Sequence, residues 1–406
     1  MTYSKAGLLE ALRTDTIHES FFVDYEESMD EYERLGAHFL EDDFMEKIER
    51  EHGFLSDRYD FVMEELRRVR NNDVCARYSF LLYKMLLRSA GQPPIRLSGR
   101  PKAESPALKT DFEMAAYFAL LALAPEAIAE YERRALPEDV RYDTMRSCFG
   151  TSVRVGTDTE RGGFNDDVSF WWNQHYVRGN IIRVGILNFQ VNSKFERDVT
   201  VFKSTRGEYK ILPTSSGISA CGLISGSAGY PDREFYADVT ESDDAFVGYE
   251  VDTGAALVTA KRVTLMKNEW HKALQHGDEI VGLHISGGVK LTPERCREAF
   301  LKCTDILRKC FPERRPKAFY CTTWLLDPQL EKMLPKSSNI VNFGRQFLRF
   351  PVCSGGKSVF TFLFKRPFGS FDQLPEKTTL EREVKAHYIA GKYIYDTGGV
   401  IFGYGI

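Results

Sequence analysis

Residues 279–334 read EIVGLHISGGVKLTPERCREAFLKCTDILRKCFPERRPKAFYCTTWLLDPQLEKML, the segment with the clearest order of secondary-structure signals in the chain. An apolar strand ends in a histidine and two glycines, a capped amphipathic helix follows, and a second strand leads into a second capped helix. This order is typical of an α/β domain that presents backbone N–H groups to a phosphate or a carbonyl. The stretch therefore predicts such a domain, with a ligand site at the turn.

The strand at residues 279–286 carries a candidate catalytic histidine. Because side chains alternate along a strand, Gly282, His284 and Ser286 share one face. A histidine at the end of a buried strand can act as a general base, since the pKa of imidazole lies near neutrality. We predict His284 as the base, and the alternative is a hydrogen-bonded histidine that fixes the following loop.

The turn after this strand predicts an anion site. Gly287 and Gly288 permit backbone conformations closed to other residues and let a ligand approach the main chain. Thr292-Pro293-Glu294 then starts a helix with a hydroxyl cap, a proline at the first position and an acid in the first turn. Free N–H groups at a helix start favour an anion. The plain alternative is a glycine turn without a ligand.

Trp324 follows the second strand, at the strand end where ligands bind in open α/β sheets. We predict that it lines a substrate pocket, and the alternative is that it packs as a lid over the core. Asp327 and Pro328 are typical of a helix N-cap and first helical position. His387 lies on an apolar helix face, so we expect a core residue with its hydrogen bonds made.

Metal and disulfide chemistry are not expected. Cys296, Cys303 and Cys310 recur every seven residues, but neighbours on such a helix are about 10 Å apart and cannot share one ion. We predict that all three are core residues. The eight cysteines form no CxxC pair, which argues against a zinc ribbon and against a secreted disulfide framework.

Two short motifs resemble catalytic signatures without completing them. Ser354-Gly-Gly-Lys-Ser resembles the end of a phosphate loop, but Pro351 stands where the first glycine belongs, so we predict a hairpin turn. The serines within residues 215–229 complete no G-x-S-x-G motif, which disfavours a serine hydrolase.

The composition limits the classes of protein to which this chain can belong. The 406 residues are 43% hydrophobic and 28% charged, with a formal net charge of −4, as in an ordinary soluble protein. The charge gives no basic surface for nucleic acid or anionic lipid. The N-terminus has no secretory signal pattern, and the longest apolar run, residues 114–125, is about half a membrane span. We expect a cytoplasmic protein that binds neither nucleic acid nor membrane.

The order of patterns predicts two domains, a helical one at residues 1–165 and an α/β one at residues 166–406. Helical periodicity dominates the first 150 residues, and a polar, glycine-containing stretch at residues 150–167 marks the boundary. The later expected elements are strands at 181–190 and 210–213, a hairpin at 245–260, an inserted loop at 214–242, a second hairpin at 347–365 and a last helix from Thr379 to Gly391.

Four groups of motifs carry a family resemblance over residues 170–395: Arg183-Val-Gly-Ile-Leu-Asn-Phe-Gln; His284-Ile-Ser-Gly-Gly with Leu291-Thr-Pro-Glu; Thr323-Trp-Leu-Leu-Asp-Pro-Gln-Leu; and Thr379-Leu-Glu-Arg with Ala386-His387. Together they resemble a bacterial family of two-domain acyltransferases. In that family a helical N-acyltransferase N-terminal domain precedes a domain similar to the GNAT (Gcn5-related N-acetyltransferase) fold.

The resemblance implies a fold and a co-substrate. The fold is a mixed, mostly antiparallel sheet flanked by helices and splayed open between two parallel central strands, here residues 279–286 and 318–322. In GNAT enzymes the first of these strands pairs with pantetheine, and the following turn holds the CoA pyrophosphate. The residues that match and would bind acyl-CoA or acetyl-CoA are Ile285, Gly287, Gly288, Val289, Lys290 and Thr292.

The chain also departs from the family pattern. The usual Gln/Arg-x-x-Gly-x-Gly/Ala phosphate turn is not spelled out, and Ser286 stands where the family more often has proline. No tyrosine follows the second strand on its helix, where GNAT enzymes often keep a general acid. The insertion at residues 214–242 has no counterpart in the pattern.

The sequence therefore predicts an acyl-CoA-dependent N-acyltransferase that transfers the acyl group directly to the amine of a small molecule or peptide. The alternative is a non-catalytic CoA sensor or interaction module whose helical domain docks a protein partner. A purely structural protein would not bind CoA at all.

Overall fold

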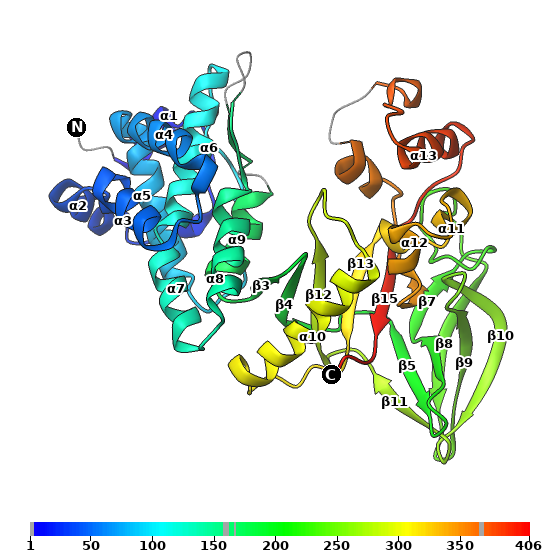
Figure 1. The fold of residues 1–406 in the computed structure, drawn as a ribbon. Coiled ribbons are helices and arrows are strands. Elements are labelled where there is room, and N and C mark those ends of the chain that lie inside the picture. Colours follow the sequence, from blue (N-terminus) through cyan, green and yellow to red (C-terminus); the bar gives the residue numbers. More distant parts are fainter. Residues whose placement is uncertain (1–3, 157–161, 166–167, 365–368) are drawn as a thin grey trace. The chain divides into compact units, whose positions relative to one another are not determined.

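The computed structural model describes residues 4–156, 162–165, 168–364 and 369–406. The chain forms two compact units, Met1–Val184 and Gly185–Ile406 (Figure 1). The predicted class, a helical N-terminal part followed by an α/β part with a mixed sheet, is confirmed.

The N-terminal unit is helical. Its helices are α1 (Lys5–Ala11), α2 (Tyr25–Leu35), α3 (Asp42–His52), α4 (Tyr59–Asn71), α5 (Asp73–Arg88), α6 (Pro106–Leu121), α7 (Ala124–Arg133), α8 (Glu138–Met145) and α9 (Ser169–Val177). The core helix is α6, which is buried on all sides from Met114 onward and packs against α4, α5 and α9. It starts where Ser105 Oγ accepts a hydrogen bond from the N–H of Leu108 and Pro106 takes the first position.

The stretch Pro106–Arg133 is, by length and composition, apolar enough to cross a membrane. However, 72% of its most apolar window is buried inside the protein. The core helix of a globular unit meets the same criterion, and the packing of α6 against its neighbours is of that kind.

The boundary between the units lies later in the chain than the sequence pattern suggests. The polar stretch at residues 150–167 predicts a division at 165/166, whereas the compact units divide after Val184. The reason is that α9 is bonded into the N-terminal unit. The Gln174 side chain makes two hydrogen bonds of 2.9 and 2.8 Å with the backbone of Ile95, and Tyr131 donates to the carbonyl of Tyr176.

The single strand predicted at residues 181–190 forms two separate strands in the structure. Residues 181–190 are interrupted at Gly185, whose φ of +58° lies in the left-handed region. The first part, β3 (Ile181–Val184), stays with the N-terminal unit, where the N–H of Arg183 donates to Thr144 Oγ1 at 2.9 Å. The second part, β4 (Leu187–Lys194), begins the C-terminal unit.

The central sheet of the C-terminal unit has the order β14-β15-β13-β12-β4. Its other strands are β12 (Glu279–Ile285), β13 (Phe319–Thr323), β14 (Leu348–Pro351) and β15 (Thr397–Ile401). β12 and β13 are parallel, and the other neighbours in this list are antiparallel. The expected pair of parallel central strands is therefore confirmed.

Helix α10 (Pro293–Cys310) covers one face of this sheet (Figure 1). Its Phe300 ring lies 5.9 Å from Phe189 of β4 and 4.8 Å from Phe319 of β13, measured between ring centroids. The three cysteines at seven-residue spacing are buried in the same helix, so their prediction as core residues is confirmed.

A β-rich insertion separates β4 from β12. It contains β5 (Val199–Ser204), β6 (Tyr209–Pro213), β7 (Ser215–Ile218), β8 (Phe235–Glu241), β9 (Ala245–Asp252), β10 (Leu257–Met266) and β11 (Trp270–Leu274), arranged as β10-β9-β8-β7 and β11-β5-β6. The predicted hairpin is β9–β10, with Asp252 Oδ1 accepting from the N–H groups of Gly254 and Ala255. The predicted loop at residues 214–242 is a loop only between β7 and β8.

The second predicted hairpin, residues 347–365, is wrong. β14 pairs with β15, and residues 360–364 form a short helical turn. The chain turns away after β14 because Ser354 and Ser358 both donate to Asp396 Oδ2, at 3.2 and 2.7 Å. Ser354-Gly-Gly therefore lies in a loop that is tied to the start of β15.

The remaining helices are α11 (Leu330–Met333), α12 (Asn339–Gly344) and α13 (Thr379–Ile389). The last one confirms the predicted C-terminal helix, and it starts with a reciprocal capping box between Thr378 and Glu381.

Candidate active site

Polar side chains gather on one face of the central sheet at the ends of β12 and β13. Gly282 of β12 is paired with Tyr320 of β13, and side chains alternate along both strands. His284 and Thr322, each two residues further on, therefore project to the same face as Tyr320. The neighbouring residues Leu283 and Phe319 project to the other face, where α10 packs.

The pairing of the two parallel strands ends beside these polar residues. Their ladder pairs Val281 with Phe319 and Gly282 with Tyr320, and it ends there in the described part of the chain. The backbone of Ile285 has the same orientation as that of Val281, because strand geometry repeats every two residues. Its N–H and C=O groups therefore face the gap that opens between β12 and β13. The early end of the ladder is the feature expected of the splayed sheet that the family resemblance implies.

His284 lies at this gap, half-buried, with Nε2 3.1 Å from Oε1 of Gln190 on β4. When Oε1 of the amide accepts a hydrogen bond from Nε2–H, the imidazole lone pair is on Nδ1. The sequence did not point to Gln190. Gln190 could have been found from the alternation of apolar and polar residues in Leu187-Asn-Phe-Gln, because this alternation places Asn188 and Gln190 on the face opposite Phe189.

A second polar residue of β4 fixes the end of β12. Asn188 is 4% exposed and lies opposite His284 in the antiparallel ladder. Its Nδ2 donates to Ser286 Oγ at 2.9 Å, and its Oδ1 has no hydrogen-bond partner among the described residues. Ser286, where the family more often has proline, is thus held by a side-chain hydrogen bond.

The predicted anion-binding residues lie together at the end of β12. Gly287, Gly288 and Lys290 are exposed, and Val289 is partly buried. Gly288 has φ +81°, and a Cβ placed on it would meet no atom within 4 Å, so the space beside this turn is open.

Helix α10 starts directly after this turn. Thr292 Oγ1 accepts from the N–H of Arg295 at 3.4 Å, and Pro293 takes the first helical position, as predicted. A helix start with free N–H groups, an exposed lysine and an open glycine turn fits the phosphates of a CoA-type ligand.

Trp324 lies elsewhere. It is 5% exposed and belongs to an apolar cluster with Leu330, Val384 and Tyr388 among others. This placement corresponds to the alternative expectation of a packed core residue. His387 also has the expected core role, with Nε2 3.3 Å from the carbonyl of Tyr393 and a pKa lowered by burial.

Asp327 has a different role from a simple helix cap, because α11 begins only at Leu330. It is 4% exposed, and its carboxylate accepts from the N–H of Gln329 at 2.9 Å and of Tyr395 at 2.7 Å. Burial raises its pKa. The side chain therefore joins α11 to the segment that leads into β15.

Three polar side chains meet on the β13 side of the gap. Arg197 Nε donates to Tyr320 Oη, Tyr320 is in hydrogen-bond contact with Thr322 Oγ1, and Arg197 Nη2 donates to the same Oγ1 at 3.4 Å. Burial raises the pKa of Tyr320, while the Arg197 charge opposes that rise. Sequence reasoning missed this group, because Arg197 comes from a segment 123 residues away from Tyr320.

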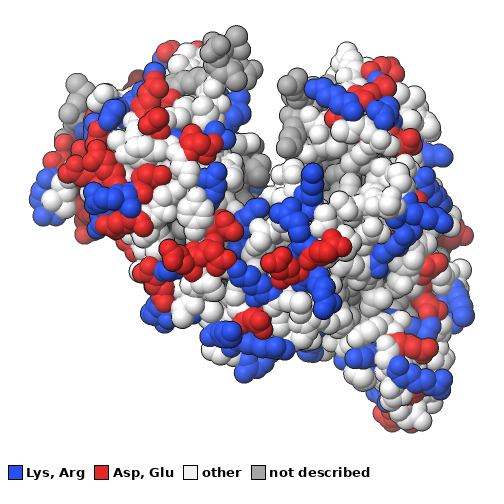
Figure 2. All heavy atoms as spheres, in the orientation of Figure 1, with Lys and Arg blue, Asp and Glu red and all other residues white. Residues whose placement is uncertain are grey.

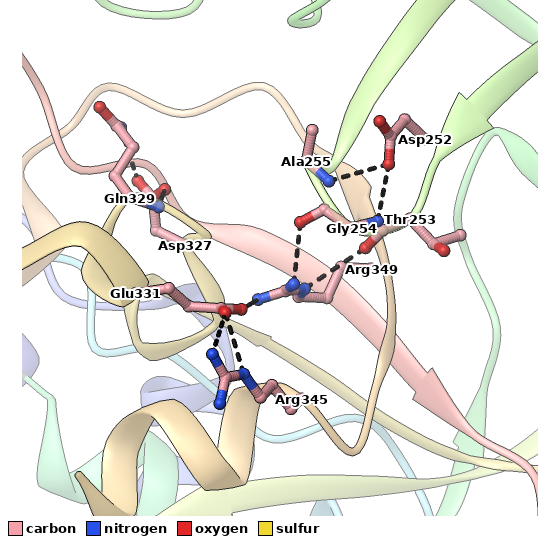
Figure 3. A network of polar contacts seen from close by, with 9 residues as sticks. All are labelled: Asp252, Thr253, Gly254, Ala255, Asp327, Gln329, Glu331, Arg345 and Arg349. Carbon is pink, nitrogen blue, oxygen red and sulfur yellow. Dashed lines mark hydrogen bonds and ion pairs between the residues drawn. The ribbon is translucent and has the colours of Figure 1, made fainter. Parts of the chain in front are cut away.

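A further network of polar contacts lies within the C-terminal unit (Figure 3). Arg349 is 6% exposed and donates to Glu331 Oε1 at 2.9 Å and to the carbonyl of Gly254 at 2.8 Å. Arg345 shares Glu331 from the exposed side. The network joins the β9–β10 turn to α11 and β14.

Among the described residues, no group of three or more His, Cys, Asp or Glu side chains is placed to hold a metal ion.

The chain matches two family profiles and several solved structures. The profile of the N-acyltransferase N-terminal domain matches residues 43–179, and that of the GNAT-like C-terminal domain matches residues 181–401. No curated protein matches significantly. An acyltransferase solved with CoA and 10C-teicoplanin is 18% identical, with 98% of this chain and 99% of that chain covered and a TM-score of 0.58.

Two further solved structures are similar. An acyltransferase in complex with decanoyl-CoA and teicoplanin is 19% identical, with the same coverage and TM-score. A mutant acyltransferase in complex with octanoyl-CoA is 18% identical over 84% of both chains, with a TM-score of 0.53. At these identities the likeness shows the fold. Because the GNAT-like profile alone covers more than half of the sequence and the N-terminal profile precedes it, the chain belongs to the family of two-domain N-acyltransferases with a GNAT-like C-terminal domain.

Proposed function

We propose that this acyltransferase moves an acyl group directly from acyl-CoA to the amine of a small molecule or peptide. The observation that carries the proposal is the gap between β12 and β13, with His284 beside it and an open glycine turn and capped helix at its end. The similar solved structures are complexes with CoA, octanoyl-CoA or decanoyl-CoA, and two of them include teicoplanin or its 10C form. These ligands support a CoA thioester as donor.

In this proposal, residues at the end of β12 bind the acyl-CoA donor. The main-chain groups of Ile285 extend the edge of the strand along pantetheine, while Gly287, Gly288 and Val289 let the backbone approach the pyrophosphate. Lys290 and the start of α10, capped by Thr292, supply positive charge and free N–H groups. CoA is a co-substrate in this scheme.

The chemical step needs a neutral amine and a polarised carbonyl. His284 removes the amine proton, directly or through water, because only the neutral amine attacks the thioester. Backbone N–H groups at Ile285 and Gly287 donate to the carbonyl oxygen as negative charge develops. Gln190 keeps the imidazole in one tautomer and orientation. A cytoplasmic setting for the reaction is part of the proposal, since none of the eight cysteines is in a disulfide bond, as is usual in a reducing compartment.

The first test is calorimetry of CoA, acetyl-CoA and decanoyl-CoA binding to the purified protein. Gly288→Trp fills the open space beside the turn and should abolish micromolar binding. Gly277→Trp is the matched control, because Gly277 also has a positive φ (+88°) and open space around its Cβ but precedes β12 at the opposite end. Both variants carry the same backbone strain, so a loss confined to Gly288→Trp locates the ligand. Absence of binding in the unmodified protein contradicts the proposal.

The alternative is a non-catalytic CoA sensor. This alternative predicts the same CoA binding as the acyltransferase, but no turnover. The protein would bind CoA at the same turn but release no free thiol from decanoyl-CoA with any member of a broad panel of primary amines. Amine-dependent thiol release excludes this alternative.

A further inference from the structure

The gap between β12 and β13 has a polar residue on each side. The ladder ends at Gly282 and Tyr320, and His284 and Thr322 follow two residues later on the same face. Thr322 is exposed. A thioester placed along β12 would therefore have the histidine on one side and the threonine hydroxyl on the other.

The hydrogen bonds around Thr322 can leave its own hydrogen unused. A guanidinium can only donate, so Arg197 donates both to Tyr320 Oη and to Thr322 Oγ1. Tyr320 Oη and Thr322 Oγ1 are also hydrogen-bonded to each other, and either hydroxyl can be the donor of that bond. When Tyr320 donates, the Thr322 oxygen accepts two hydrogen bonds and its hydroxyl keeps its own hydrogen for a further acceptor, in a bond that this chain of donors strengthens.

We infer that Tyr320 donates to Thr322 and that the Thr322 hydroxyl is a catalytic hydrogen-bond donor to the departing sulfur of the thioester, with Tyr320 and Arg197 as the positioning residues behind it. The inference rests on the proposed acyl-CoA function and supplies a group that stabilises the leaving thiolate, in place of a tyrosine on the helix after β13.

The proton and electron balance is complete. The amine nitrogen bonds to the carbonyl carbon, and His284 takes one of its protons. The carbon–sulfur bond breaks with its electron pair on sulfur, and the hydrogen bond from the Thr322 hydroxyl, which keeps its proton, stabilises the thiolate. The proton taken by His284 passes to solvent and the thiolate takes up a proton from solvent on release, so each turnover gives one amide and one CoA thiol.

The test uses the thiol of bound CoA and needs no acceptor. A donor aimed at sulfur stabilises the thiolate, so the thiol of bound CoA should have a lower pKa in the unmodified protein than in Thr322→Val. The expected difference is about one to two pH units, because a hydrogen bond to a charged group has that strength. The thiolate is followed by its ultraviolet absorbance during a pH titration of the CoA complex. Thr264→Val, another exposed strand threonine, is the matched control and should change nothing.

Two further measurements keep the inference falsifiable. Tyr320→Phe removes the hydrogen behind Thr322 and should raise the thiol pKa by a smaller amount, which provides a second readout if Thr322→Val does not fold. Calorimetric CoA binding is measured on each protein. Normal CoA binding with an unchanged thiol pKa in both variants overturns the role of Thr322 and leaves the proposed function standing. Absence of CoA binding in the unmodified protein overturns both.

Discussion

At the scale of single residues, the site depends on how its side chains are held. Gln190 fixes one nitrogen of His284, and Asn188 fixes Ser286 at the strand end. Neither support is visible in the sequence motif around His284, because both come from β4. The histidine itself could be predicted from its position at the end of a strand, whereas its partners depend on a pairing between segments 94 residues apart.

Replacement of His284 by alanine should lower the rate of amide formation by about 10²–10⁴-fold, the usual loss when a general base is removed. CoA binding should persist, since the proposal assigns the imidazole no contact with CoA. Single-turnover kinetics with decanoyl-CoA measure the chemical step, and calorimetry measures binding. A variant that keeps full turnover shows that the histidine has a structural role.

Replacement of Gln190 by leucine should act through His284. Loss of the amide that orients the imidazole should lower turnover while CoA affinity stays unchanged, and the pH profile of turnover should shift. Gln190→Glu offers the contrast, because a carboxylate still accepts from Nε2 and stabilises the charged imidazolium, which raises the apparent pKa of the base. Identical pH profiles for the three proteins would contradict the contact.

His175 predicts a pH dependence of stability in the N-terminal unit. It is 8% exposed, and burial lowers its pKa to about 4. The folded chain therefore binds this proton more weakly than the unfolded chain, so stability is lost as pH falls from about 6.5 towards 4. The Trp171 and Trp172 rings are both 5.4 Å from the His175 ring, so tryptophan fluorescence in urea reports the transition. His175→Phe should flatten the dependence, and an unchanged slope would contradict the assignment.

At the scale of elements, the sequence was most informative where local signals suffice. β12, the glycine turn, α10 with its Thr292 cap and the β9–β10 hairpin could all be predicted, since alternation, caps and turn residues act over a few positions. The hairpin at residues 347–365 failed because the partner of β14 is β15, which comes from residues 397–401. A strand shows its own pattern in sequence but does not identify its partner.

The network around Glu331 provides a matched pair of substitutions at this scale (Figure 3). Arg349→Ala leaves the carbonyl of Gly254 and the Glu331 carboxylate without a buried donor, and it should cost about 2–4 kcal/mol of stability. Arg345 has a side chain that is 43% exposed and contacts the same carboxylate, so Arg345→Ala should cost under about 1 kcal/mol. Urea unfolding measures both. Similar losses in the two variants would contradict the distinction between buried and exposed partners.

At the scale of the whole molecule, charge is divided between the two units. Residues 1–184 contain 24 Lys and Arg against 33 Asp and Glu, whereas residues 185–406 contain 30 against 25. Figure 2 shows acidic side chains gathered on the N-terminal helices on the face drawn there. The unit that carries the proposed donor site therefore has a net positive charge, which favours binding of the polyanionic CoA. The N-terminal unit has a net negative charge, which favours a protonated amine.

This division predicts opposite electrostatic preferences for the two substrates. CoA binding should weaken several-fold as salt rises from about 0.1 M to about 1 M, where the Debye length falls from about 10 Å to about 3 Å. In turnover assays, cationic amines should show a lower KM than neutral amines of similar size, and that advantage should shrink with salt. A salt-independent CoA affinity would contradict the electrostatic contribution.

The early end of the β12–β13 ladder also bears on how such a protein changes over evolution. A ligand held by main-chain groups at a strand edge makes little demand on the identity of the side chains there. Substitutions can then accumulate while the edge itself persists, and the fold is retained at 18–19% identity to the solved acyltransferases. If the proposed donor site is correct, new acceptor preferences can arise in such a lineage by substitution of side chains elsewhere, while the strand edge that would hold the thioester stays unchanged.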